Sequence, residues 1–127
     1  MARTLAEMMA SARSEAHEIP PARASEAPAD VIIDVREPGE YQERHLPRAI
    51  NIPRGVLEMR ADPASPGANQ TLVADRSARI LVYCLKDPSA RSLLAAQTLG
   101  SMGYPNVEVL GGGLTAWAEA GLPVESA

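Results

Sequence analysis

Residues 80–92 read ILVYCLKDPSARS, and this stretch decides the fold of the chain. Its first four residues are apolar and include β-branched and aromatic side chains, a pattern typical of a short strand buried on both faces. Asp87 and Pro88 form a helix-start signal, because aspartate can cap free amides and proline fits the first helical position. From Leu93 the apolar spacing indicates a helix. The stretch therefore predicts a strand, a short loop and a helix.

Cys84, the only cysteine in the chain, lies where this predicted strand ends. A thiol just before a helix lies among unpaired backbone N–H groups and near the positive end of the helix dipole. Such surroundings favour the thiolate, which is the nucleophilic form, and Arg91 adds a positive charge nearby. From these residues alone, two interpretations stay open: an activated nucleophile, or a small apolar residue of the core.

Composition excludes several classes of function. The 127 residues suffice for one core, and the net charge of −4 comes from interspersed acids and bases, so we expect no nucleic-acid partner. The apolar runs are too short to cross a membrane, and residues 1–16 lack the apolar core of a secretory signal. One cysteine forms neither an internal disulfide nor a zinc cluster, and the two histidines show no ligand spacing. We therefore expect a cytoplasmic protein without a bound metal.

Strand and helix patterns alternate along the rest of the chain. Thr4 and Glu7 match a capping box for a helix over 4–16, which either covers the domain or provides a surface for dimerisation. We expect residues 1–30 to be this helix with a Pro- and Ala-rich lead-in, in which an edge strand at residue 19 and a short helix over 21–27 are both left open. Residues 31–127 are expected to form the main domain. The further expected elements are strands over 31–35, 49–52 and 107–110, helices over 38–45, 53–59 and 114–120, and a polar loop over 61–75.

This alternation predicts an α/β fold, a three-layer sandwich with a mostly parallel central sheet. Sites in such sheets form outside the carboxyl ends of the strands. Asp34, Cys84 and the glycines 111–113 all fall at the carboxyl ends of predicted strands, so we expect them at one edge. We interpret Asp34 as structural rather than catalytic, with Arg36 as its nearby partner.

Four stretches can be compared with known motifs. Residues 34–41 read DVREPGEY, residues 45–53 read HLPRAINIP, residues 82–92 hold the cysteine and end in ARS, and residues 109–117 read VLGGGLTAW. In this order they resemble the motifs of the single-domain rhodanese-like sulfurtransferases, over about residues 31–124. The resemblance covers most of the chain.

The resemblance implies a specific chemistry. A cysteine of this family takes a sulfane sulfur from thiosulfate or a persulfide donor and passes it, as a cysteine persulfide, to a thiol or cyanide. The partners implied are a small anionic sulfur donor and a thiol acceptor, including a protein acceptor, and no cofactor is required. Cys84 is then the catalytic residue, and Asp34 and Arg36 lie behind the site. The substrate-binding residues implied are Leu85, Lys86, Ser89, Ala90, Arg91 and Ser92.

The loop after Cys84 departs from the family pattern. The family commonly has arginine five residues after the cysteine, whereas Arg91 follows Cys84 by seven, and the loop has no glycine. An aspartate facing the sulfur would repel an anion, so we expect Asp87 to turn back and cap the helix, with Ser89 supplying a hydroxyl. Two alternatives to a sulfurtransferase stay open: a catalytically weak binding or sensing module, and a cysteine phosphatase or arsenate reductase.

Overall fold

The computed structural model describes residues 2–127. Its central sheet consists of parallel strands in the order β1-β5-β4-β2-β3. The strands are β1 (Glu18–Ile19), β2 (Val31–Asp34), β3 (Ala49–Asn51), β4 (Ile80–Tyr83) and β5 (Val107–Leu110). The helices are α1 (Leu5–Glu15), α2 (Pro21–Glu26), α3 (Pro38–Glu43), the 3-10 helix η1 (Arg54–Val56), α4 (Leu57–Ala61), α5 (Gln70–Val73), α6 (Ala90–Ser101) and α7 (Gly113–Glu119).

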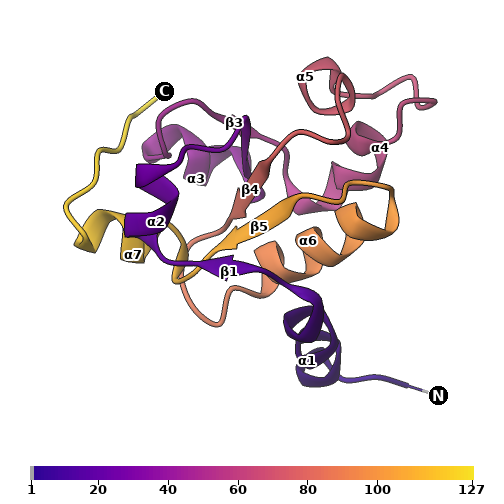
Figure 1. Ribbon diagram of the computed structural model, residues 1–127, viewed down its shortest axis with the longest axis horizontal. Coiled ribbons are helices and arrows are strands. Elements are labelled where there is room, and N and C mark those ends of the chain that lie inside the picture. Colours follow the sequence, from indigo (N-terminus) through magenta and orange to yellow (C-terminus); the bar gives the residue numbers. More distant parts are fainter. Residues whose placement is uncertain (1) are drawn as a thin grey trace.

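Helices cover both faces of this sheet, which confirms the predicted three-layer α/β fold (Figure 1). On one face α4, α5 and α6 pack over a core that includes Ile33, Ile80 and Val82. On the other face α2 and α7 pack over Ile32 and Leu81, with Trp117 buried among them. Alternate residues of β2 and β4 therefore enter opposite cores, which explains why both strands read as continuous apolar runs.

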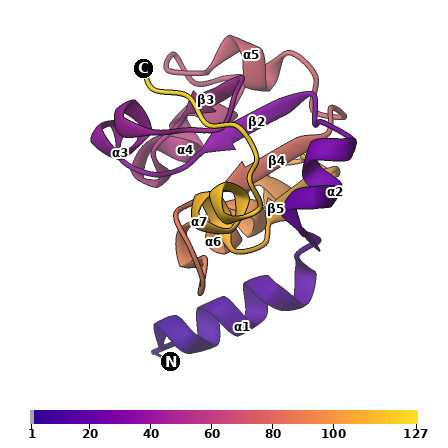
Figure 2. The same cartoon turned by 90° about the vertical axis from the view of Figure 1, so that its left-hand side faces the viewer.

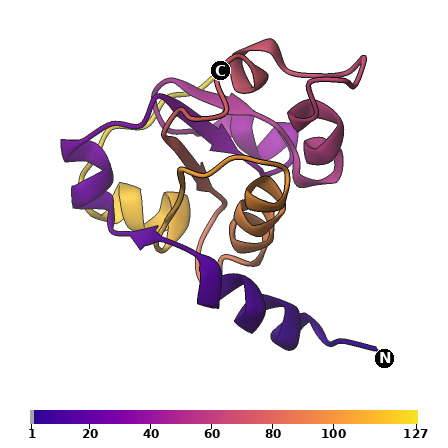
Figure 3. The same ribbon diagram turned by 45° about the vertical axis from the view of Figure 1, so that its right-hand side comes forward.

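The segment before β2 forms the predicted helix α1, and also the short strand and the short helix that its sequence left open. Thr4 caps α1 through the expected capping box with Glu7. β1 adds to the edge of the sheet beside β5, and α2 follows it directly. α1 itself projects beyond the sheet and rests against α6 (Figure 3). The predicted domain boundary between residues 30 and 31 stays a prediction.

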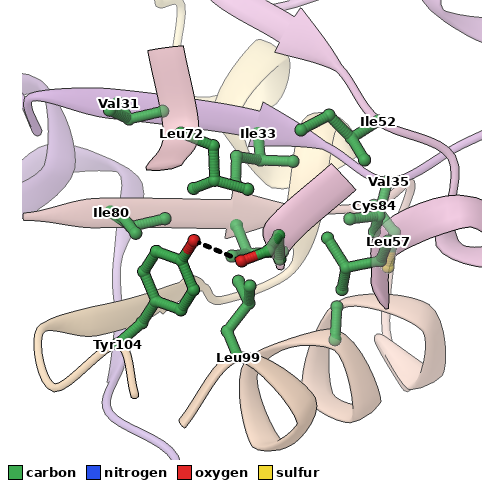
Figure 4. Packing of buried hydrophobic residues seen from close by; sticks show 13 residues of the cluster. Val31, Ile33, Val35, Ile52, Leu57, Leu72, Ile80, Cys84, Leu99 and Tyr104 are labelled. Carbon is green, nitrogen blue, oxygen red and sulfur yellow. Dashed lines mark hydrogen bonds between the residues drawn. The ribbon is translucent and has the colours of Figure 1, made fainter. Parts of the chain in front are cut away.

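Two expectations about the elements are wrong. The helix after β4 begins at Ala90 with Ser89 as its N-cap, not at Pro88. The segment 61–75 is not a plain loop, because it contains α5, whose Leu72 is buried against the core. Figure 4 shows Leu72 between Val31 and Ile33 of β2, on the side of the core where Ile80 and Tyr104 lie, whereas Cys84 lies on the other side, after the end of β4. The segment thus covers the edge of the sheet opposite the cysteine.

Candidate active site

Cys84 follows the last residue of β4 and is 3% exposed. Its side chain belongs to the core between the sheet and α6, where the neighbouring apolar residues include Val35 and Leu57 (Figure 4). The sulfur atom Sγ lies 3.3 Å from the hydroxyl Oγ of Ser92, in the first turn of α6. Aliphatic side chains therefore enclose the thiol on one side, and a polar helix end meets it on the other.

The Ser92 hydroxyl links the thiol to the backbone of the loop. Its Oγ lies 3.2 Å from the carbonyl oxygen of Ser89 as well as 3.3 Å from Cys84 Sγ. A hydroxyl has a single proton, so it can donate to only one of these two atoms. With a neutral thiol, S–H donates to Ser92 and Ser92 donates to Ser89. A thiolate has no proton to give, so the hydroxyl would turn and donate to the sulfur.

The loop from Leu85 to Ser89 takes a path that the helix-start signal did not predict. Asp87 does not cap α6, since no side chain bonds to its first turn. Instead Ser89 Oγ donates to Asp87 Oδ1 at 3.2 Å, and Ser89 N donates to the carbonyl of Lys86 at 3.0 Å. Asp87 is exposed to solvent. Among the described residues, no hydrogen bond joins the Asp87 carboxylate to Cys84.

Backbone donors remain available around the loop. Among residues 2–127, no acceptor is found for the N–H groups of Ala90, Arg91 and Ser92, which form the first turn of α6. The same holds for the N–H groups of Leu85, Lys86 and Asp87. Free amides at a helix start, together with the helix dipole, attract an anion. This end of α6 can therefore stabilise negative charge near Cys84.

α7 holds the start of the loop in place. The carbonyl of Cys84 accepts from Leu114 N at 3.0 Å, and the carbonyl of Leu85 accepts from Thr115 N at 2.8 Å. The approach is close because Gly113 has no side chain: a Cβ there would lie 2.6 Å from Cys84 O. The third glycine of 111–113 is thus needed where α7 meets the cysteine.

Arg91 is paired with Glu40, a residue that no local sequence pattern connects to it. Its Nη1 and Nη2 donate to Glu40 Oε1 at 2.7 Å and Glu40 Oε2 at 3.2 Å. The bond from Arg91 lowers the pKa of Glu40. The bond to Glu40 raises the pKa of Arg91, and a negative charge on Cys84 would raise the pKa of Arg91 as well. Glu40 belongs to the quoted segment 34–41, but its partner lies 51 residues later, so no local pattern connects the two.

Asp34 and Arg36 form a buried network behind the site. Arg36 Nη2 donates to Asp34 Oδ2 at 2.7 Å, and the hydroxyl of Tyr83 donates to the same oxygen at 2.6 Å. Burial raises the pKa of Tyr83 and the Asp34 carboxylate raises it further, so the phenol stays protonated and keeps donating. The network fixes Tyr83, the residue before Cys84. Among the described residues no hydrogen bond joins Asp34 or Arg36 to Cys84 itself.

The predicted site residues thus fall into four groups. Cys84, Ser92 and the first turn of α6 come together around the sulfur. Leu85 is half-buried under α7, while the side chain of Lys86 is exposed on the loop. Arg91 lies at the rim, held by α3, and Asp34 and Arg36 belong to the network behind the strand. For the described residues, no cluster of side chains suited to a metal ion is found, and no helix is long and apolar enough to span a membrane.

The chain matches the family model of the rhodanese-like domain over residues 21–120. It is 39% identical over 80 residues to thiosulfate sulfurtransferase PspE from Escherichia coli, covering 63% of this chain and 67% of that protein. It is 31% identical over 94 residues to a sulfurtransferase from Allochromatium vinosum, covering 74% of this chain and 77% of that protein. The chain spans 19%, 46% and 58% of three longer curated relatives.

A solved structure resembles the chain over almost its whole length. This is a protein of unknown function from Rhodopseudomonas palustris, described as a possible tyrosine phosphatase. It superposes with a TM-score of 0.86 at 33% identity, covering 98% of this chain and 96% of the other. The similarity therefore extends beyond the matched domain into the N-terminal segment.

Proposed function

This chain belongs to the rhodanese-like family, and from that premise we propose that it is a sulfurtransferase that carries sulfane sulfur as a persulfide on Cys84. One observation carries the proposal: the sulfur of Cys84 meets the Ser92 hydroxyl at 3.3 Å beneath the uncapped first turn of α6. That arrangement supplies a nucleophile and donors for negative charge in one place.

The proposed reaction has two displacement steps at sulfur. The Cys84 thiolate attacks the sulfane sulfur of thiosulfate, a new S–S bond forms on Cys84, and sulfite leaves with the electron pair of the broken bond. An acceptor thiolate or cyanide then attacks the outer sulfur of the persulfide. The bond between the two sulfurs breaks, and Cys84 leaves again as a thiolate. No net oxidant or reductant is consumed.

The loop, the first turn of α6 and the residues behind the site have proposed parts in binding the anionic donor and the persulfide. The backbone N–H groups of Leu85, Lys86, Ala90, Arg91 and Ser92 offer hydrogen bonds, and the Ser92 hydroxyl turns toward the thiolate. Ser89 begins α6 and orders the loop through its bonds to Lys86 and Asp87. Arg91 adds a rim charge that Glu40 partly balances. Asp34 and Arg36 act at a distance, by fixing Tyr83.

Mass spectrometry after thiosulfate treatment tests the proposal directly. We expect Cys84 to gain the mass of one sulfur atom, cyanide to be converted to thiocyanate, and Cys84→Ser to lose both. Ser92→Ala should slow transfer about tenfold or more, because a hydrogen bond to a charged group is lost. Ser101→Ala is the matched control, since Ser101 Oγ bonds Thr98 O on the same helix away from the sulfur. An unmodified Cys84 would refute the proposal and favour a binding module.

A cysteine phosphatase is the second candidate, because the Rhodopseudomonas protein at 33% identity is described as a possible tyrosine phosphatase. Six residues separate Cys84 from Arg91, one more than in the C-x5-R loops of cysteine phosphatases. Arg91 is also occupied by Glu40. Hydrolysis of an aryl phosphate, or reduction of arsenate, that depends on both Cys84 and Arg91 would support this candidate.

A further inference from the structure

The helix α1 precedes the region matched by the family model, yet it packs directly beside the site. Ala12 is 1% exposed and lies among Leu93, Ala96 and Val109. Gln97 Nε2 donates to Ser11 Oγ at 3.2 Å and to Glu15 Oε2 at 3.1 Å. α1 is thereby attached to α6, the helix that begins at the cysteine loop, and Figure 2 shows that loop extending toward α1.

Arg13 of α1 contacts the tip of the loop. Its Nη2 donates to the carbonyl oxygen of Pro88 at 3.1 Å, while its Nε donates to Glu18 Oε1 in β1 at 3.1 Å. The guanidinium is planar and its donors have fixed directions, so two bonds determine where the group lies. Pro88 also lines a groove that it shares with one face of α1. Arg13 thus connects the loop tip to the edge of the sheet.

The loop has few other attachments to the protein. Its start is held by the bond from Thr115 N to Leu85 O. The bonds from Ser89 to Lys86 and to Asp87 are internal to the loop. Within residues 2–127, only the hydrogen bond from Arg13 joins Asp87 or Pro88 to a residue outside the loop.

We propose that Arg13 is a positioning residue for the sulfur site, because it holds the lengthened loop in the conformation that presents its amides to the donor. The proposal rests on the proposed function as far as catalysis is concerned. It also accounts for a loop that lacks glycine and carries proline: an arginine from α1 orders the loop tip from outside. Arg13 does not touch the sulfur and acts only through the position of Pro88.

Hydrogen–deuterium exchange on the full chain tests this proposal, with Arg13→Gln as the variant and Arg3→Gln, just before the N-cap of α1, as the control. Arg3 Nη2 donates to the carbonyl of Glu7 at 3.5 Å, and among residues 2–127 no hydrogen bond joins Arg3 to the loop. We expect the Ser89 amide, which donates to the carbonyl of Lys86 at 3.0 Å, to exchange about two- to tenfold faster in Arg13→Gln, because a neighbouring loop bond from a charged donor is lost. Peptides from α1 should exchange as in the wild type, since Ala12 and Gln97 still hold the helix.

Enzyme kinetics separate positioning from a purely structural role. In Arg13→Gln the KM for thiosulfate should rise about two- to tenfold with kcat changed less, and Glu18→Gln should give a smaller rise in the same direction. If the exchange rate of the loop amide is the same in Arg13→Gln as in the wild type, the proposal is wrong. It is also wrong if the amides of α1 exchange faster in the variant, because Arg13 would then stabilise the helix and not the loop. If the wild type transfers no sulfur, the proposed function fails, and the exchange measurement still decides the role of Arg13.

Discussion

Arg91 lies at the rim of the site, and its positive charge is balanced by the carboxylate of Glu40. Its guanidinium forms two bonds to the Glu40 carboxylate, and the two side chains are 38% and 34% exposed. A bidentate pair of this kind fixes geometry as well as charge. Because the pair is neutral overall, attraction for an anionic donor depends mainly on the backbone amides of the loop and of α6. Glu40 therefore positions Arg91 while reducing its pull on anions.

The pH dependence of stability should reveal this pair. The bond from Arg91 lowers the pKa of Glu40 below its ordinary value of 4.5, so the pair stabilises the fold fully above that pH and loses its effect as the pH falls through the lowered pKa. We expect Glu40→Gln to be less stable than the wild type by about 0.5–1 kcal/mol at pH 7. Urea unfolding at a series of pH values should show this difference disappear in acid.

Glu43→Gln is the control for that measurement, because Glu43 is exposed at the end of the same helix. It should change the free energy of unfolding little at any pH. A stability difference between wild type and Glu40→Gln that persists well below the ordinary carboxylate range would contradict the assignment of the shift to the Arg91 pair.

At the scale of elements, the start of α7 packs against the beginning of the cysteine loop and holds it by hydrogen bonds. Gly113 has a φ of 59°, and a Cβ on it would lie 2.6 Å from Cys84 O and 2.7 Å from Leu85 C. The first-turn amides of α7 then bond the carbonyls of Cys84 and Leu85. The approach requires a residue with no side chain, and this requirement explains why glycine stands at the start of the helix.

Gly113→Ala should therefore damage both stability and sulfur transfer. We expect a loss of about 2–5 kcal/mol in the free energy of unfolding, from a backbone clash added to an unfavourable positive φ. Gly121→Ala is the control at the other end of α7, since Gly121 has a φ of 79° with nothing within 4 Å of the added Cβ. It should cost only about 1–2 kcal/mol and leave transfer intact. Equal losses in the two variants, measured by thermal unfolding and thiocyanate formation, would contradict this account.

The helices and strands could be predicted where the pattern of apolar and capping residues lies within a short stretch of the sequence. β2, β4, β5 and the capping box of α1 all follow from residues within one short window. The start of α6 was not predictable in this way. Asp87 and Pro88 have the composition of a helix start, but the path of the loop is set by Leu114, Thr115 and Arg13, which lie far away in the sequence. The pairing of Arg91 with Glu40 could not be predicted for the same reason, because the two residues are 51 positions apart in the sequence.

At the scale of the whole molecule, the carboxyl ends and the amino ends of the strands have different roles. The carboxyl edge holds Cys84, the start of α6 and the start of α7. The amino edge is closed by α5, whose Leu72 packs in the same core as Tyr104, and by the bond from Tyr104 Oη to Ala61 O at 2.7 Å. From its composition, the segment 61–75 resembles an exposed loop or lid, because its one leucine comes after a stretch rich in proline and polar residues. Only the fold shows that this leucine completes the core.

This division predicts that substitutions at the amino edge affect stability without affecting chemistry. Leu72→Ala should lower the free energy of unfolding by about 2–5 kcal/mol, since Leu72 is 1% exposed and its removal leaves a cavity. Leu5→Ala, at a leucine that is 58% exposed, should be close to neutral. At a temperature where both variants are folded, we expect the KM for thiosulfate of each to stay within about twofold of the wild type. A large change in that KM for Leu72→Ala alone would mean that the segment 61–75 communicates with the cysteine edge, and the separation of the two edges would have to be abandoned.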